Sequence, residues 1–218
     1  MRRLILFTLL SLPALADNGH YLIDFGYSGN SQQTTVMGWT NFTDIQEVAK
    51  SSISVVDSTG AATSVTVQAV TTVSSSNCVN NSFLGATGTG LYPDTATGDY
   101  FFASTAGYNS CPGTWEFNMS GLNSSKTYNW KLYCSRTGVA DNRTTLYTVG
   151  TAQASLNCAN NTTGTVTISN VAPSSGTIHF KMEVGAGNNS TSGFSYINVI
   201  EVTSQDRSQN VRRRWYGQ

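Results

Sequence analysis

Short runs rich in β-branched and aromatic residues recur along most of this 218-residue chain, with Gly, Asn, Ser or Pro between them. Clear examples are HYLIDFG (20–26), TWEFNMS (114–120) and FSYINVIEV (194–202). Helical segments do not alternate with these runs, so a parallel sheet built from βαβ units is disfavoured. The pattern predicts an all-β fold, namely a two-sheet antiparallel β-sandwich of jelly-roll type. At most one short helix is expected, in TDIQEVAKSS (43–52), where apolar residues recur at helical spacing.

The run from Ile178 to Val184 indicates how these strands build a core. Apolar and polar side chains alternate along it, and successive side chains of a strand point to opposite faces of the sheet. The expected inward set is Ile178, Phe180, Met182 and Val184, and the expected outward set is His179, Lys181 and Glu183. Such a strand is typical of an antiparallel sheet that covers a core on one face.

The N-terminus carries a targeting signal. The segment MRRLILFTLLSLPALA has two arginines, a short apolar stretch and small residues at Ala14 and Ala16, which is typical of a signal peptide over residues 1–16. We therefore predict that the protein is secreted and is extracellular or at the cell surface. No later stretch is apolar for long enough to span a membrane. The rest divides into one β-sandwich domain at 17–203 and a flexible tail at 204–218, which is basic and aromatic.

An even number of cysteines, namely Cys78, Cys111, Cys134 and Cys158, favours two disulfides in an oxidising compartment. Sequence alone leaves the alternative pairings open. We prefer Cys134 with Cys158, because both end strand-like runs, NWKLYC and ASLNC, that can be neighbours. This choice leaves Cys78 with Cys111 between two loops. Zinc is disfavoured, since no C-x-x-C spacing occurs and both histidines are far from the cysteines in sequence.

Charge is sparse in this chain, and charged residues make up only 11% of it. Ser, Thr, Asn and Gly supply most of the polar surface, which is typical of a secreted β-rich protein. Outside the first three residues and the arginine-rich end, acidic residues outnumber basic ones. A mildly acidic body argues against a groove for phosphates, so we expect no nucleic-acid partner.

Aromatic and planar polar residues are the candidates for ligand binding. A sugar site needs an aromatic plane for the apolar face of the ring and planar polar groups for its hydroxyls. The candidates are Trp39, Tyr92, Tyr100, Tyr108, Arg136, Asp141 and Arg143. The arginines have an alternative role, in which at least one of them pairs with Asp141 or Asp99 and braces the loops. Trp115 and Trp130 lie in alternating strands and are expected in the core.

Catalysis is the minority hypothesis, and we expect the protein not to be an enzyme. The G-x-S-x-G motif of α/β-hydrolases is absent, and no βαβ frame is predicted to carry it. The sequence does not exclude two carboxylates that act together in glycoside cleavage, but it singles out no pair. His179 has no Ser or Cys partner in a recognisable context, so a solvated histidine on a strand is the simpler interpretation.

Several short motifs follow one another in an order that resembles a known type of domain. They are DFG (24–26), YP-x-x-A (92–96), L-x-x-S-K-T-Y (122–128), SR (135–136), T-x-Y-x-V (145–149), N-V-x-P (170–173) and Y-x-N-x-x-E (196–201). Their order resembles the bacterial secreted galactose-binding-like domains, of discoidin or carbohydrate-binding-module type, that accompany extracellular carbohydrate-active enzymes and esterases. The resemblance covers residues 20–202 and implies a jelly-roll sandwich with a glycan-directed function.

A structural Ca²⁺ ion is a further implication of this resemblance, because galactose-binding-like sandwiches often hold one. Calcium needs several oxygen ligands. Asp24 on the first strand and Asn198 and Glu201 on the last are the candidates, since they are adjacent if the terminal strands pair. In the alternative interpretation, Asp24 and Glu201 are hydrogen-bonded acids at strand ends. No other cofactor is indicated.

Three functions remain to be distinguished. The favoured one is a secreted, non-catalytic carbohydrate-binding module whose partner is a glycan or polysaccharide. The alternative is a structural or adhesive module of a surface or virion-type assembly that binds protein partners, and a glycan hydrolase is the third. An exposed aromatic cluster flanked by Arg or Asp favours the first, a broad apolar patch the second, and two facing carboxylates in a cleft the third.

Overall fold

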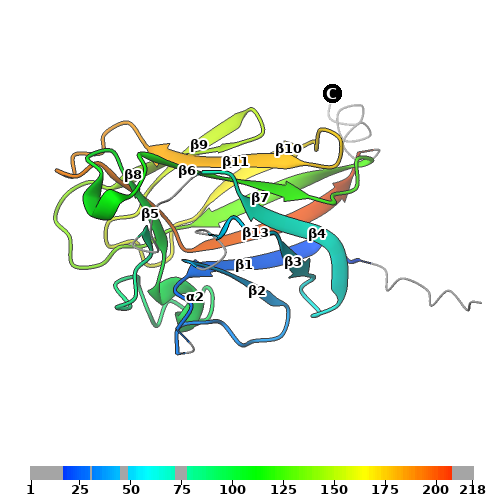
Figure 1. Cartoon of the computed structure of the whole chain (residues 1–218), viewed down its shortest axis with the longest axis horizontal. Coiled ribbons are helices and arrows are strands. Elements are labelled where there is room, and N and C mark those ends of the chain that lie inside the picture. Colours follow the sequence, from blue (N-terminus) through cyan, green and yellow to red (C-terminus); the bar gives the residue numbers. More distant parts are fainter. Residues whose placement is uncertain (1–16, 30, 45–48, 72–77, 208–218) are drawn as a thin grey trace, which may run out of the picture.

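The β-type runs of the sequence form two sheets that pack face to face (Figure 1). The computed structural model describes residues 17–29, 31–44, 49–71 and 78–207. The predicted β-sandwich is confirmed. The predicted signal peptide (1–16) and residues 45–48 of the predicted helix lie outside the described residues.

One sheet contains both terminal strands of the domain, and its strand order is β10-β7-β13-β1-β2. Its strands are β1 (His20–Gly26), β2 (Trp39–Thr43), β7 (Lys126–Tyr133), β10 (Val166–Val171) and β13 (Val199–Asp206). Strand β1 pairs antiparallel with β13 but parallel with β2. The parallel pair departs from the antiparallel expectation, because β2 begins with Trp39 opposite Leu22, near the start of β1, and runs in the same direction.

The opposite sheet has six strands in the order β3-β4-β6-β11-β8-β9, and all its neighbours are antiparallel. Its strands are β3 (Ile53–Val56), β4 (Ala62–Ala69), β6 (Thr114–Ser120), β8 (Thr144–Val149), β9 (Ala152–Asn157) and β11 (Ile178–Val184). The predicted alternation of β11 is present, since Ile178, Phe180 and Met182 are buried. Val184, at the strand end, is only partly buried.

Aromatic rings from both sheets fill the space between them. Phe117 and Phe180 stack with their ring centroids 4.6 Å apart, and Trp130 from the facing sheet lies 6.2 Å from Phe180. Trp115 and Trp130 are 1% and 0% exposed, which confirms their expected place in the core. Contacts of this kind add to the free energy gained by burying the rings.

A small third sheet, β5 (Phe101–Ser104) with β12 (Phe194–Ile197), lies at one end of the sandwich. The short helix α2 (Asp94–Gly98) is at the same end, on the left of Figure 1, and a 3-10 turn, η2 (Tyr108–Ser110), follows β5. The continuous run FSYINVIEV is therefore split at Asn198, where the chain leaves the small sheet and enters the first sheet. The Asn198 side chain holds this corner by donating to the carbonyl oxygens of Thr97 and Asp99.

Strand β13 continues beyond the predicted domain boundary at 203. Ser204–Asp206 pair with Tyr128–Lys126 of β7, so the ladder extends three residues into the segment predicted as the tail. Residues 208–218 of that segment lie outside the described part of the chain. No helix in the described part is both long and apolar enough to span a membrane.

Candidate functional site

Four aromatic rings share one face of the small sheet. Phe102 lies opposite Tyr196 in the ladder between β5 and β12. Tyr100 is two residues before Phe102, and Phe194 is two residues before Tyr196. Because side chains two apart on a strand share a face, the four rings point to the same side. Their centroids are 5.0 Å apart for Tyr100 and Tyr196 and 5.8 Å apart for Phe102 and Phe194. The intervening Phe101 packs instead against Phe25, Phe42 and Trp115 between the two large sheets.

Tyr108 adds a fifth ring at the edge of this group. It lies in turn η2, its centroid is 5.3 Å from that of Phe194, and it is 50% exposed. The Ser104 hydroxyl holds the turn by accepting from the Tyr108 N–H at 3.1 Å and donating to Ser192 O at 2.7 Å. Asn109 has a φ of 52°, in the left-handed region, which is a strained conformation often found at binding sites.

Arg143 packs over the rings and pairs with Asp141. Its guanidinium carbon lies 4.9 Å from the Phe194 centroid, and its Nε is 2.8 Å from Asp141 Oδ1. A second bond joins Nη2 to Asp141 Oδ2, and Nη1 donates to the Tyr196 hydroxyl. The hydrogen bonds from Arg143 lower the pKa of Asp141. Arg143 therefore has the bracing role that the sequence offered as an alternative.

Arg136 lies in the same region without a carboxylate contact. Its backbone N–H donates to Cys158 O and its carbonyl accepts from Asn160, both at 2.8 Å, while its Nη1 donates to Thr137 O. Within the described residues no Asp or Glu oxygen lies within 4.0 Å of its side chain. Burial raises the pKa of Tyr100, and the positive charge of the nearby Arg136 opposes this shift.

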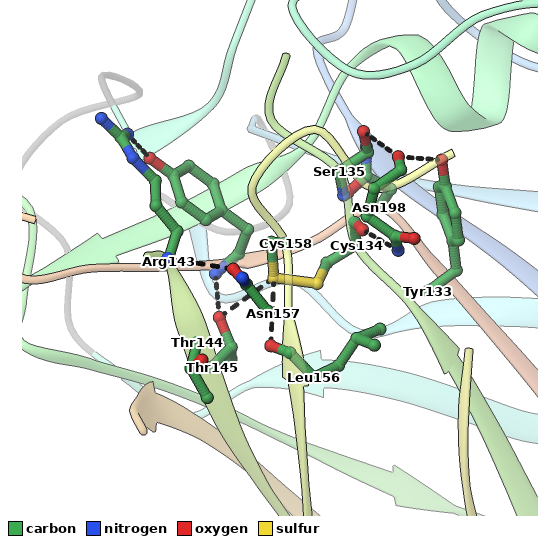
Figure 2. The surroundings of a disulfide bond; sticks show 12 residues. Tyr133, Cys134, Ser135, Arg143, Thr144, Thr145, Leu156, Asn157, Cys158 and Asn198 are labelled. Carbon is green, nitrogen blue, oxygen red and sulfur yellow. Dashed lines mark hydrogen bonds between the residues drawn. A yellow bond between two sulfur atoms is a disulfide. The ribbon is translucent and has the colours of Figure 1, made fainter. Parts of the chain in front are cut away.

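Two disulfides hold the loops that carry these residues. Cys134 pairs with Cys158 and Cys78 with Cys111, which are the pairings preferred from the sequence. Figure 2 shows Ser135 and Asn198 on one side of the Cys134–Cys158 bond, joined by a hydrogen bond of 2.7 Å, with Arg143 and Thr145 on the other. The Cys134–Cys158 disulfide connects the end of β7 to the end of β9 and so joins the two sheets beside Arg136.

The five rings and the two arginines line one pocket of about 330 Å³. Its lining residues are Val79, Asn80, Asn81, Leu84, Tyr100, Phe102, Tyr108, Asn109, Arg136, Arg143, Ser192, Phe194 and Tyr196. The Cys78–Cys111 disulfide is adjacent in sequence to Val79–Asn81 and follows Tyr108–Ser110, so it joins two of the pocket walls. The pocket is thus aromatic in its interior, with amide and guanidinium groups at its walls.

Trp39 and Tyr92 belong to a different cluster and are not lining residues of this pocket. Their rings meet at 5.7 Å on the outer face of the first sheet. The Tyr92 hydroxyl donates to Glu201 at 2.8 Å, and Glu201 also contacts Lys131 at 3.2 Å and His20 at 2.9 Å. Of the seven predicted binding residues, Tyr100, Tyr108, Arg136 and Arg143 meet in the pocket, and Asp141 supports Arg143.

The three predicted calcium ligands are engaged in separate contacts. Both Glu201 oxygens accept hydrogen bonds from side chains, and the Asn198 amide donates twice and accepts from Ser135 N–H. Only Asp24 has an oxygen without a partner in the described residues. No group of three or more His, Cys, Asp or Glu side chains in the described ranges is placed to hold a metal. The arrangement does not fit one calcium ion bound by Asp24, Asn198 and Glu201.

Asp24 is instead a buried carboxyl group that lies near enough to the buried Asp99 to influence the pKa of Asp99. They are 2% and 0% exposed, and each accepts one backbone N–H, from Thr34 and Tyr27 respectively. The Oδ1 atom of each has no hydrogen-bond partner in the described part of the chain. Burial raises the pKa of both groups above 3.8, and for Asp99 the nearby charge of Asp24 raises it further. Burial therefore favours the protonated form of these carboxyl groups.

Sequence reasoning missed Phe102, Phe194 and Tyr196 as pocket residues. They lie within strand-like runs, where an aromatic residue usually packs in a core. A signal was present, since Tyr100 with Phe102 and Phe194 with Tyr196 are both aromatic pairs at a spacing of two. That spacing puts each pair on one face but does not show that the face borders a pocket.

Comparison with known proteins gives distant structural matches. No protein-family model and no curated protein matches the sequence. The structure is similar to a ruminal GH26 endo-beta-1,4-mannanase (TM-score 0.29, 10% identity, covering 48% of this chain and 19% of that one). It is similar to the ANXUR1 extracellular domain from Arabidopsis thaliana (TM-score 0.44, 11% identity, covering 85% of this chain and 48% of that one). An F5/8 type C domain from Bacteroides fragilis also matches (TM-score 0.33, 11% identity, covering 65% of this chain and 92% of that one). The chain spans less than half the length of the first two.

Proposed function

We propose that this protein is a secreted, non-catalytic carbohydrate-binding module that takes its ligand in the pocket at the small-sheet end. The observation that carries the proposal is the convergence of five aromatic rings, two arginines and three asparagines on one cavity of about 330 Å³. This volume is near the lower end of the range for ligand pockets, roughly 300–1,000 Å³. It suits a small ligand such as a single sugar ring.

The chemistry of the lining supports binding over catalysis. Tyr108 offers a half-exposed ring for the apolar face of a sugar, and the amides and guanidinium groups pair with hydroxyls. The lining contains no Asp, Glu, His or Cys, and Ser192, the nucleophile type that it does contain, has no His or carboxylate base beside it in the lining. The disulfides and the predicted signal peptide support secretion.

The alternative function, a structural or adhesive module, has weaker support. In the described residues the exposed large hydrophobic side chains are Val36, Met37, Val70 and Tyr108. Val36 and Met37 are adjacent, but a pair of this kind is smaller than the patches that mark protein interfaces. We therefore place the protein-binding role second.

A glycan array with purified, oxidised protein tests the proposal. Tyr108→Ala is expected to weaken binding at least about tenfold, because loss of an aromatic ring that covers the apolar face of a sugar commonly costs that much affinity. The free energy of unfolding should change by less than about 1 kcal/mol, since the ring is half exposed. Titration of each positive glycan by calorimetry measures the first effect, and urea denaturation the second.

Tyr92→Ala is the matched control, because Tyr92 is a partly exposed tyrosine outside the pocket. It should leave glycan binding unchanged. Loss of binding in Tyr92→Ala but not in Tyr108→Ala would place the ligand on the outer face of the first sheet instead. Absence of binding to every glycan would reject the carbohydrate function.

A further inference from the structure

The balance of charge in the pocket narrows the class of sugar that fits it. Two guanidinium groups line the pocket, and no carboxylate does. Asp141 compensates the charge of Arg143 through two hydrogen bonds. Arg136 has no ion-pair partner in the part of the chain that the structure describes. The pocket therefore has a local excess of positive charge, although the body of the protein is mildly acidic.

We propose, on the basis of the function proposed above, that the ligand is an acidic sugar whose carboxylate pairs with Arg136. A guanidinium group is planar and has five N–H donors in a fork that matches a carboxylate in two places. One of these donors is used internally, on Thr137 O. The Arg136 side chain also hydrogen-bonds with the Tyr100 side chain. The remaining donors can contact a ligand.

The surroundings of Arg136 strengthen such a pair. Tyr100, Phe102 and Tyr196 are 3%, 8% and 2% exposed and form the interior wall of the pocket. An ion pair beside buried rings is screened less than one in open water. The backbone of Arg136 is also held between Cys158 and Asn160, so the arginine is positioned before a ligand arrives.

Pairs of ligands that differ only in charge show whether the pocket recognises the carboxylate or only the shape of the sugar. We would titrate the protein with oligosaccharides of galacturonate, glucuronate and mannuronate and with their methyl esters, which have the same ring and linkage but no charge. At least one acid should bind about tenfold or more tightly than its ester, as expected for a hydrogen-bonded charge. Its affinity should fall as the salt concentration rises.

Variants then assign the effect to one side chain. Arg136→Gln should remove the preference for the acid and leave the affinity for the ester unchanged. Arg136→Lys should recover only part of the preference, because an ammonium group lacks the planar fork. Arg207→Gln, which changes an exposed arginine outside the pocket, should bind like the wild type. Thermal melting checks that each variant is folded.

The failures of the two proposals are distinguishable. If neutral glycans or the methyl esters bind at least as tightly as the acids, and Tyr108→Ala weakens that binding, the pocket binds sugar but the acidic class is wrong. If the ratio of the affinities for an acid and its methyl ester is the same in the wild type and in Arg136→Gln, Arg136 does not bind the carboxylate. If neither acidic nor neutral glycans bind, the proposed function itself fails.

Discussion

Replacing Cys134 and Cys158 together with alanine should lower the free energy of unfolding by about 3–4 kcal/mol. The bond closes a loop with a sequence separation of 24 residues, and a cross-link of this length removes that much conformational entropy from the unfolded chain. Both cysteines are 0% exposed, so their replacement also leaves a small cavity. Urea denaturation, followed by fluorescence of the buried Trp115 and Trp130, measures the change.

The same variant should lose ligand affinity, because Arg136 depends on the position of Cys158. Its N–H donates to Cys158 O, and the disulfide holds that carbonyl against the end of β7. Cys78→Ala with Cys111→Ala is the comparison, since it removes a disulfide that adjoins other lining residues, Val79–Asn81 and Tyr108–Asn109. A loss of stability under about 1 kcal/mol in the Cys134 and Cys158 variant would show that side-chain packing and the backbone hydrogen bonds of Arg136 with Cys158 and Asn160 are sufficient to hold the two sheets together there.

Asp99→Asn should stabilise the protein at alkaline pH by about 2 kcal/mol or more. The folded pKa values of Asp24 and Asp99 lie above the unfolded value of 3.8, so the native state binds more protons than the unfolded state. Their contribution to stability is complete below about pH 4 and is lost as the pH rises towards about 9, the raised pKa of Asp99. An asparagine resembles the protonated carboxyl and avoids this loss.

Urea denaturation of the wild type and the variant between about pH 5 and pH 9 measures the effect. The difference in stability between the two should grow with pH. Asp141→Asn is the control, because the lowered pKa of Asp141 leaves this carboxyl ionised throughout that range. Equal slopes of stability against pH in the wild type and in Asp99→Asn would contradict a raised pKa of Asp99. Stabilisation by Ca²⁺ in the wild type alone would show that a cation, not a proton, compensates the pair.

Local pattern predicted most of the strands and favoured, among the open alternatives, the cysteine pairing that the structure has. The alternation in Ile178–Val184 placed Phe180 and Met182 in the core, because the period of a strand assigns faces without tertiary information. Cys134 and Cys158 were paired correctly since each follows a strand-like run. Strand β2 was not among the recognised runs, and its parallel pairing with β1 depends on the path of residues 27–38.

The candidate site shows where local pattern fails. Tyr108 and Arg136 were recognised because aromatic and guanidinium groups in loops are common ligand contacts. Trp39 and Tyr92 satisfied the same rule but lie in another cluster, because residue type does not show which loops meet in space. Phe102 and Tyr196 reach the pocket because Asn198 ends the small sheet and turns the chain into β13.

The sequence by itself determined the fold class, the alternating faces of the strands and the residue types available for binding, because each of these depends on neighbours along the chain. Tertiary structure decided which of those residues form the pocket, which of its two arginines has no carboxylate partner within the described residues, and that the buried Asp24 is near enough to Asp99 to raise the pKa of Asp99. These outcomes depend on distances between segments far apart in sequence. Charge balance and desolvation are set by such distances, and no local pattern contains them.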